Sequence, residues 1–372
     1  MSISPTWIDR AASSLYIGLM SGTSLDGIDA VLFDSEGKAM TCHVHLPFPQ
    51  VLRSELLSLH VPGADEANRC ALASIELSRL YAESVSLLLE KAKIPGHEVA
   101  AIGCHGQTIR HRPESGYSIQ LVDSPLLAEL TGITVVSNFR NRDIAAGGQG
   151  APLVPAFHES VFRDPRVHRV ILNLGGIANL TDLPPEGPVR GFDCGPANML
   201  LDAWIALNLG QPYDEEGKWA KSGKVLPDLL DSFLEEEYFS MPPPKSTGRE
   251  TFSLEWLGRH LEGKERPEDV QATLLQLTAR SAAEAMALHC SNASEIYLCG
   301  GGARNAELVR VLKGLLRGRK VESTESLGIA VDQVEAAAFA WLARQALKGL
   351  PGNLPEVTGA RERRILGAIH PA

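Results

Sequence analysis

The sequence predicts an α/β protein of two domains that share one order of strands and helices. Its 372 residues exceed the roughly 250 to 300 at which a single hydrophobic core stops growing. Two stretches, starting near residues 15 and 167, each open with three strand patterns and a glycine-bearing turn. These observations favour a duplicated domain. We expect the first domain at 1–135 plus about 335–372, and the second at 136–334.

In the first stretch, short apolar runs predict strands at 15–20, 28–34 and 38–46. Apolar residues at helical spacing follow at 67–93. Further strand patterns lie at 99–104, 117–122 and 133–137, and a helix begins at Pro125. The predicted order is therefore three strands and a helix, followed by strands alternating with helices.

The second stretch repeats this order, with strand patterns at 167–174, 177–183 and 189–193. A helix is expected at 197–209, with Pro196 at its start, because proline is tolerated in the first helical turn. Helices at 270–289, 303–316 and 332–347 and a strand at 295–299 complete it. Residues 210–266 fit neither repeat and predict an insertion, which is either a solvated surface or a substrate-facing element.

Composition excludes several classes of function. The net charge of −10 argues against nonspecific nucleic-acid binding, which needs a basic face. The six cysteines show no pairing or spacing typical of a structural metal. No apolar run approaches the roughly 20 residues of a membrane span, and residues 1–14 lack the pattern of a secretory signal. We therefore expect a cytoplasmic protein that binds small molecules.

Three glycine-centred turns, at 22–27, 173–179 and 299–305, each follow a strand pattern. Glycine lets backbone N–H groups approach phosphate, although a single such turn is often only a tight connection. Neither a Walker A nor a Rossmann glycine motif occurs. The residues expected to bind ATP are Gly22, Thr23, Ser24, Leu25, Asp26, Gly27, Ile28, Asp29, Gly175, Gly176, Gly300, Gly301, Gly302 and Asn305.

A divalent cation is expected beside the phosphates, because hard cations take oxygen ligands. Asp26 is the preferred ligand for Mg²⁺, since Asp29 falls within the following strand pattern. Either carboxylate could instead only brace the turn. The duplicated plan with its three turns resembles the actin, hexokinase and Hsp70 type of ATPase, an RNase H-like fold with a nucleotide cleft between its domains.

The chain also resembles the anhydro-N-acetylmuramic acid kinase family of bacterial cell-wall recycling, along nearly its whole length. The matching stretches are Gly18-Leu-Met-Ser-Gly-Thr-Ser-Leu-Asp-Gly-Ile-Asp, Cys104-His-Gly-Gln-Thr, Gly147-Gly-Gln-Gly-Ala-Pro-Leu-Val-Pro, Asn173-Leu-Gly-Gly-Ile-Ala-Asn-Leu-Thr, Phe192-Asp-Cys-Gly-Pro-Ala-Asn, Pro243-Pro-Lys-Ser-Thr-Gly-Arg-Glu and Val357-Thr-Gly-Ala. The resemblance implies a kinase that phosphorylates the C6 oxygen of 1,6-anhydro-N-acetylmuramic acid with ATP while water opens the anhydro bridge at C1. It also implies a homodimer.

Asp193 has two interpretations from the residues alone, as a catalytic carboxylate at a strand end or as a turn residue before a helix. The resemblance implies that it is the general base that activates water. Cys194 stands where the family usually has threonine, and Asn138 where it usually has aspartate, so a role that needs a carboxylate at 138 is in doubt.

Four further residues are candidates for contact with the sugar: His105, Gln107, Arg140 and Glu335. Arg140, together with Arg142, could pair with the lactyl carboxylate or with phosphate. His105 could equally be a structural histidine, and Glu335 a surface acid of a helix. Two other functions remain open at this point: another sugar or carboxylate kinase of the same fold, and a non-enzymatic nucleotide switch.

Overall fold

The computed structural model describes residues 13–22, 25–248 and 251–372. The chain divides into two compact units, Met1–Phe157 with Gln333–Ala372 and His158–Asp332. The expected boundary at 135 is therefore too early. The strand β7 (Val135–Ser137) pairs with strands of the first unit, which keeps the following residues up to Phe157 in that unit.

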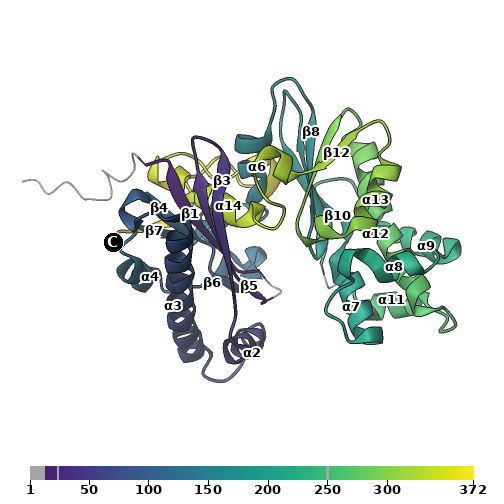
Figure 1. Cartoon of the computed structure of the whole chain (residues 1–372), viewed down its shortest axis with the longest axis horizontal. Coiled ribbons are helices and arrows are strands. Elements are labelled where there is room, and N and C mark those ends of the chain that lie inside the picture. The colour runs from purple at the N-terminus through teal and green to yellow at the C-terminus, as the bar shows by residue number, and fades with distance from the viewer. Residues whose placement is uncertain (1–12, 23–24, 249–250) are drawn as a thin grey trace, which may run out of the picture. The chain divides into compact units, whose positions relative to one another are not determined.

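The first unit contains a six-stranded sheet with the order β13-β7-β4-β1-β2-β3 (Figure 1). Its strands are β1 (Leu15–Met20), β2 (Gly27–Asp34), β3 (Ala39–Pro47), β4 (Ala101–Cys104), β7 (Val135–Ser137) and β13 (Ala368–His370). β1, β2 and β3 pair antiparallel, whereas β1, β4 and β7 run parallel. A separate hairpin pairs β5 (Gln107–Arg112) with β6 (Tyr117–Leu121).

The two faces of this sheet are covered by different helices, because successive side chains of a strand point to opposite faces. On one face, Ile17 and Leu19 of β1 join a core with Leu77, Tyr81 and other residues of α3 (Glu66–Ala92). On the other, Gly18 of β1 lies against α14 (Val334–Leu347), whose many alanines allow close approach. The remaining helices are α2 (Gln50–Ser58), α4 (Ser124–Thr131), α5 (Phe139–Ala145) and α15 (Pro355–Thr358), and α6 (Val154–Phe162) leads into the second unit.

The second unit contains a five-stranded sheet with the order β10-β9-β8-β11-β12. Its strands are β8 (Arg169–Leu174), β9 (Ile177–Leu183), β10 (Arg190–Pro196), β11 (Glu295–Cys299) and β12 (Lys320–Ser323). β8, β9 and β10 pair antiparallel, and β8, β11 and β12 run parallel. The sequence of pairings equals that of β3-β2-β1-β4-β7, which confirms the duplicated actin- and hexokinase-type, RNase H-like fold.

Helices α7 (Asn198–Leu209), α12 (Pro267–His289) and α13 (Ala306–Leu315) complete this unit. The expected insertion forms α8 (Lys218–Ser222), α9 (Pro227–Leu234), α10 (Glu237–Ser240) and α11 (Leu254–His260). Leu229, Phe233 and Trp256 of the insertion share one hydrophobic core with Val270 and Leu274 of α12. The insertion is therefore an integral part of the second unit rather than a solvated excursion.

One expectation for an individual element is wrong, and some elements were not predicted. Pro196 does not start a helix; it ends β10, where it pairs with Ile177, and α7 begins at Asn198. A proline without an N–H donor fits the last position of a strand at the edge of a sheet. The four-residue strand β12 has no counterpart in the sequence prediction, because so short a run has little periodicity. Within the described residues, no helix has both the length and the apolar character needed to cross a membrane.

Candidate active site

The first glycine turn joins β1 to β2, and Thr23 and Ser24 of this turn lie outside the described residues. Leu25 has a positive φ of 56° and donates its N–H to the carbonyl oxygen of Gly22 at 3.3 Å. The side chains of Leu25 and Ile28 are buried in the core of the first unit, so only their backbone groups could face a ligand. A Cβ at Gly27 would collide with the carbonyl of Leu46, so packing against β3 alone requires glycine there.

The two carboxylates of this turn have different surroundings. Asp26 is exposed, and its Oδ1 accepts the N–H of Gly27 at 3.0 Å. Asp29 lies within β2, and its Oδ1 is 2.9 Å from Nδ1 of His45. Among the described residues, no three His, Cys, Asp or Glu side chains converge on a metal site. An exposed single carboxylate fits Mg²⁺, which is commonly held by one or two carboxylates together with substrate phosphates.

Gln107 lies directly beneath the first turn. Its side-chain Nε2 donates to the carbonyl oxygens of Gly22 at 3.2 Å and of Thr108 at 3.3 Å. The residue is fully buried. These contacts make Gln107 a brace that fixes the backbone of the first turn, in addition to the expected role at the sugar.

His105 and Arg140 form a tight pair in the first unit. Nε and Nη2 of Arg140 donate to Nε2 of His105 at 3.2 and 2.8 Å, and Nη1 donates to the carbonyl oxygen of Gly150 at 2.8 Å. Burial, with a further contribution from Arg140, holds the pKa of His105 well below its usual value, so the imidazole is neutral and accepts. His105 therefore orients the guanidinium of Arg140.

Glu335 stands in the first turn of α14, in the same unit. Burial raises the pKa of its carboxyl, and the charge of Arg140 lowers it. The net effect is a pKa above the usual value, since burial is the largest influence and the charge of Asp29 adds to it. Burial lowers the pKa of Arg140 to about 10, which leaves the guanidinium charged at neutral pH. Arg142 is exposed and lies on the same short helix, α5.

The substitution Arg140→Lys tests whether the oriented guanidinium group of Arg140 is important. A lysine keeps the charge but cannot donate simultaneously to His105 and Gly150 with the geometry of a guanidinium. For the acidic sugar that the family resemblance implies, we expect the Michaelis constant to rise about tenfold, with a smaller change for ATP. Steady-state kinetics with each substrate varied in turn will measure both, and Arg79→Lys, at an exposed arginine of α3 in the same unit, is the matched control. An unchanged constant for the sugar in Arg140→Lys would remove Arg140 from the binding residues.

Sequence reasoning missed Asp143, a fully buried carboxylate at the centre of the first unit's loops. It accepts hydrogen bonds from the N–H of Gly150 at 2.8 Å, from Asn353 at 2.7 Å and from the hydroxyl of Thr358 at 2.8 Å. Asp143 thus fixes the loop whose Gly150 carbonyl binds Arg140. Two of the matching stretches, at 147–155 and 357–360, meet at Asp143, and only the structure brings them together.

The second glycine turn joins β8 to β9 in the other unit. The carbonyl of Gly175 accepts the N–H of Asn198, and the carbonyl of Gly176 accepts those of Ala197 and Met199, all at 3.0 to 3.1 Å. A Cβ at either glycine would meet no atom closer than 3.6 Å, so packing does not require glycine at these two positions. Close approach of a ligand is one physical reason for a Gly-Gly pair beside the start of α7.

In the third turn, only one of three glycines is unexplained by packing. A Cβ at Gly300, which has a φ of 77°, would collide with Asn173, and one at Gly302 would lie 2.7 Å from Cβ of Leu174. A Cβ at Gly301 would make only an ordinary contact. Asn305 caps α13, because its Oδ1 accepts the N–H of Leu308 at 3.0 Å.

Asp193 lies near the end of β10, where the register shifts between Asp193 and Gly195. Its N–H donates to the carbonyl of Lys245 at 3.1 Å, and its Oδ2 accepts the N–H of Thr247 at 2.9 Å. Its own carbonyl accepts the hydroxyl of Tyr238 at 2.8 Å. None of these partners was a candidate from the sequence, although Lys245 and Thr247 belong to a matching stretch without an assigned role.

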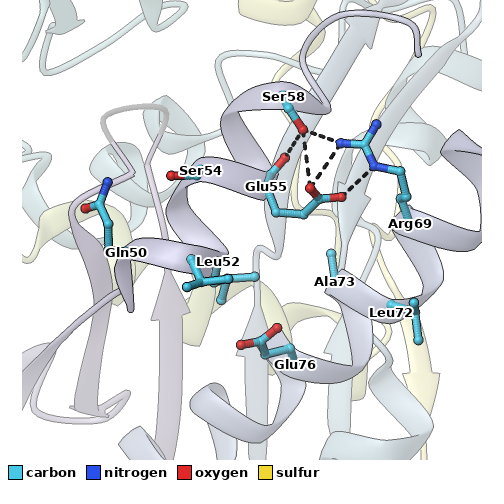
Figure 2. Close-up of a pocket in the computed structure, with 10 residues that line it drawn as sticks. Gln50, Leu52, Ser54, Glu55, Ser58, Arg69, Leu72, Ala73 and Glu76 are labelled. Atoms are coloured by element: carbon cyan, nitrogen blue, oxygen red, sulfur yellow. Dashed lines mark hydrogen bonds and ion pairs between the residues drawn. The ribbon is translucent and has the colours of Figure 1, made fainter. Parts of the chain in front are cut away.

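A pocket of about 600 Å³ lies elsewhere in the first unit, between α2 and α3 (Figure 2). Its lining includes Leu52 and Glu76, and Glu55 forms an ion pair with Arg69 at 2.7 Å. None of the candidate residues lines it. This pocket is therefore separate from the groups described above.

The family model for anhydro-N-acetylmuramic acid kinase matches residues 14–372. The chain is 58% identical to the anhydro-N-acetylmuramic acid kinase of Nitrosospira multiformis, over 97% of this chain and 100% of the relative. It is 52% identical to that of Pseudomonas syringae pv. syringae, over 96% and 99%. Among solved structures, component A of the (R)-2-hydroxyglutaryl-CoA dehydratase of Acidaminococcus fermentans is similar with a TM-score of 0.48 and 14% identity, over 90% of this chain and 100% of that one.

Proposed function

The chain belongs to the anhydro-N-acetylmuramic acid kinase family, and we propose that Asp193 is the general base of its reaction. The protein is an anhydro-N-acetylmuramic acid kinase, an enzyme that transfers a phosphoryl group. In the reaction that we propose, ATP phosphorylates the C6 oxygen of 1,6-anhydro-N-acetylmuramic acid while water opens the anhydro bridge at C1. The products are N-acetylmuramate 6-phosphate and ADP.

The observation that supports this role most directly is the way in which the Asp193 carboxylate is held. The backbone N–H of Thr247 donates to Oδ2 of Asp193 at 2.9 Å. The backbone N–H and the backbone carbonyl of Asp193 each form a hydrogen bond as well. A backbone N–H that donates to a carboxylate favours its charged form and fixes its orientation. In this role Asp193 removes a proton from water as the water oxygen attacks C1, and the bond from C1 to the bridging oxygen breaks. The released C6 oxygen then attacks the γ-phosphorus of ATP.

For the nucleotide, we propose that backbone groups of the Gly175-Gly176 turn and of Gly301 approach the phosphates. These are the glycines that packing leaves unexplained. Gly22 and the neighbouring first turn are proposed to contact phosphate as well, with Asp26 as the carboxylate that holds Mg²⁺, which supplies positive charge to the phosphoryl oxygens.

For the sugar, we propose that Arg140 binds the lactyl carboxylate and that Glu335 contacts a neutral polar group of the ring. The guanidinium remains charged, and His105 fixes its orientation. A planar donor pair matches the geometry of a carboxylate. Family membership also supports a cytoplasmic homodimer, and light scattering of the purified protein would measure the oligomeric state.

The reaction can be tested with ATP, Mg²⁺ and a panel of sugars in water enriched in ¹⁸O. We expect ADP release with the anhydro sugar but not with glucose or N-acetylglucosamine, and the label at C1 of the product. Label in inorganic phosphate would indicate plain hydrolysis of ATP. Turnover of glucose in preference to the anhydro sugar would overturn the proposed substrate.

A further inference from the structure

Three groups hold the strand end that carries Asp193, and we call them the Asp193 clamp: Tyr238, Lys245 and the backbone N–H of Thr247. The hydroxyl of Tyr238 donates to the Asp193 carbonyl at 2.8 Å. The segment from Lys245 to Thr247 accepts the N–H of Asp193 through one carbonyl and donates to its carboxylate through one N–H. The clamp thus contacts both the backbone and the side chain of Asp193.

Lys245 is the anchor of this segment. Lys245 is only 8% exposed, and its ammonium donates to the carbonyls of Tyr238 at 3.0 Å and Phe239 at 3.2 Å. The same ammonium lies 4.7 Å from the centre of the Tyr238 ring. A buried ammonium that binds two carbonyls and an aromatic face is costly to displace, because each of these contacts replaces lost hydration. The side chain of Lys245 therefore ties its own segment to α10.

We propose that Lys245 and Tyr238 are positioning residues that hold the Thr247 N–H against the Asp193 carboxylate. This inference rests on the proposed role of Asp193 as the base. Neither side chain needs to touch the substrate: each acts by fixing the backbone on either side of the carboxylate. The Pro-Lys-Ser-Thr-Gly stretch at 244–248 thereby acquires a physical role in the reaction.

The charges around Asp193 determine what loss of the clamp would do. Cys194 on β10 and Tyr238 on α10 interact electrostatically with Asp193, and Lys245 interacts in turn with Cys194 and with His289 on α12. Burial raises the pKa values of Cys194 and Tyr238, so both stay protonated and neutral, and it lowers the pKa of His289. Lys245 is a cation of this group. Removing its side chain loosens the segment that carries the Thr247 N–H, and a weaker hydrogen bond stabilises the charged Asp193 carboxylate less.

The decisive variant is Lys245→Met, which keeps the length of the side chain and removes its charge and donors. We expect kcat to fall roughly 10- to 100-fold, because small displacements of a reacting group are costly. We also expect the acidic limb of the rate profile to move to higher pH, because the Thr247 N–H that favours the charged carboxylate is held less firmly. The affinity for ATP, measured by calorimetry, should change less than threefold. Lys245→Arg should restore most of kcat.

The second variant, Tyr238→Phe, removes one hydroxyl and leaves the ring beneath Lys245. It tests the positioning role even if Lys245→Met does not fold. It should lower kcat several-fold with the Michaelis constant for the sugar unchanged. Lys320→Met is the matched control, since Lys320 also lies over a tyrosine of this unit, at 5.4 Å from the ring of Tyr297. It should leave both kcat and the pH profile unchanged.

The two levels of the proposal fail in different ways. If Tyr238→Phe and the folded Lys245 variants keep the wild-type kcat and pH profile while Asp193→Asn is inactive, the positioning role is wrong and the base is retained. If Asp193→Asn itself keeps full activity, the assigned base is wrong, whatever the clamp variants do.

Discussion

Asp193→Asn is expected to lower kcat about 1000-fold while leaving ATP binding intact. Asparagine has the shape of aspartate, and its side-chain oxygen can still accept the N–H of Thr247, so the local geometry is retained. What is lost is the ability to take a proton from water, and general base catalysis contributes typically 10²- to 10⁴-fold. Release of ADP in the presence of the anhydro sugar measures kcat, and calorimetric titration measures the affinity for ATP.

An exposed aspartate of the same unit provides the control. Asp231 lies on α9, where its carboxylate is 4.0 Å from Arg280 at the surface. Exposed pairs of this kind contribute little, so Asp231→Asn should retain wild-type kcat. Full turnover in Asp193→Asn would exclude Asp193 as the base, and loss of ATP binding in that variant would indicate a disturbed fold rather than a lost proton acceptor.

Much of the fold follows from local signals in the sequence. The strands β1, β9 and β11 and the helix α3 lie within about one residue of the predicted ranges, because each has a clear apolar periodicity. The turn at 175–176 is similarly visible as two glycines between apolar runs. The duplication was predictable for the same reason. In each half of the chain, local apolar patterns show the strands and helices in the same order.

The sequence could not show what each glycine does. Gly27, Gly175 and Gly301 look alike in the sequence, yet packing requires glycine only at the first of the three. The distinction depends on the atoms that a Cβ would meet, and those belong to residues distant in the chain. The helix cap formed by Asn305 is in contrast a local interaction, and it offers an interpretation of that residue without a ligand.

The same limit applies to the groups that hold the candidate catalytic residues. Lys245 lies 52 positions after Asp193, and Thr358 lies 215 positions after Asp143. Neither contact produces a periodic pattern in the sequence, because a single hydrogen bond between distant loops does not constrain the neighbouring residues. The family resemblance pointed to these stretches without assigning them contacts.

Gly103→Ala is expected to destabilise the first unit by about 3 kcal/mol or more. Gly103 on β4 and Gly18 on β1 are paired in the sheet, and both face the backbone of α14. A Cβ at Gly103 would overlap the carbonyl oxygen of Phe339, and one at Gly18 that of Ala336. Backbone atoms of a buried helix cannot move aside as a flexible side chain can. Overpacking commonly costs about 1 to 3 kcal/mol of folding free energy, and about 4 kcal/mol where the surrounding atoms cannot shift.

A displacement of α14 would also affect a candidate sugar contact, because this helix begins at Val334 and carries Glu335 in its first turn. Urea unfolding of Gly103→Ala against wild type measures the free energy, and Gly96→Ala is the control in the same unit, since its Cβ would meet no atom closer than 3.5 Å. We expect Gly96→Ala to change stability by less than about 0.5 kcal/mol. If Gly103→Ala were as stable as Gly96→Ala, α14 would not lie against β4 as closely as described, and the placement of Glu335 would have to be revised with it.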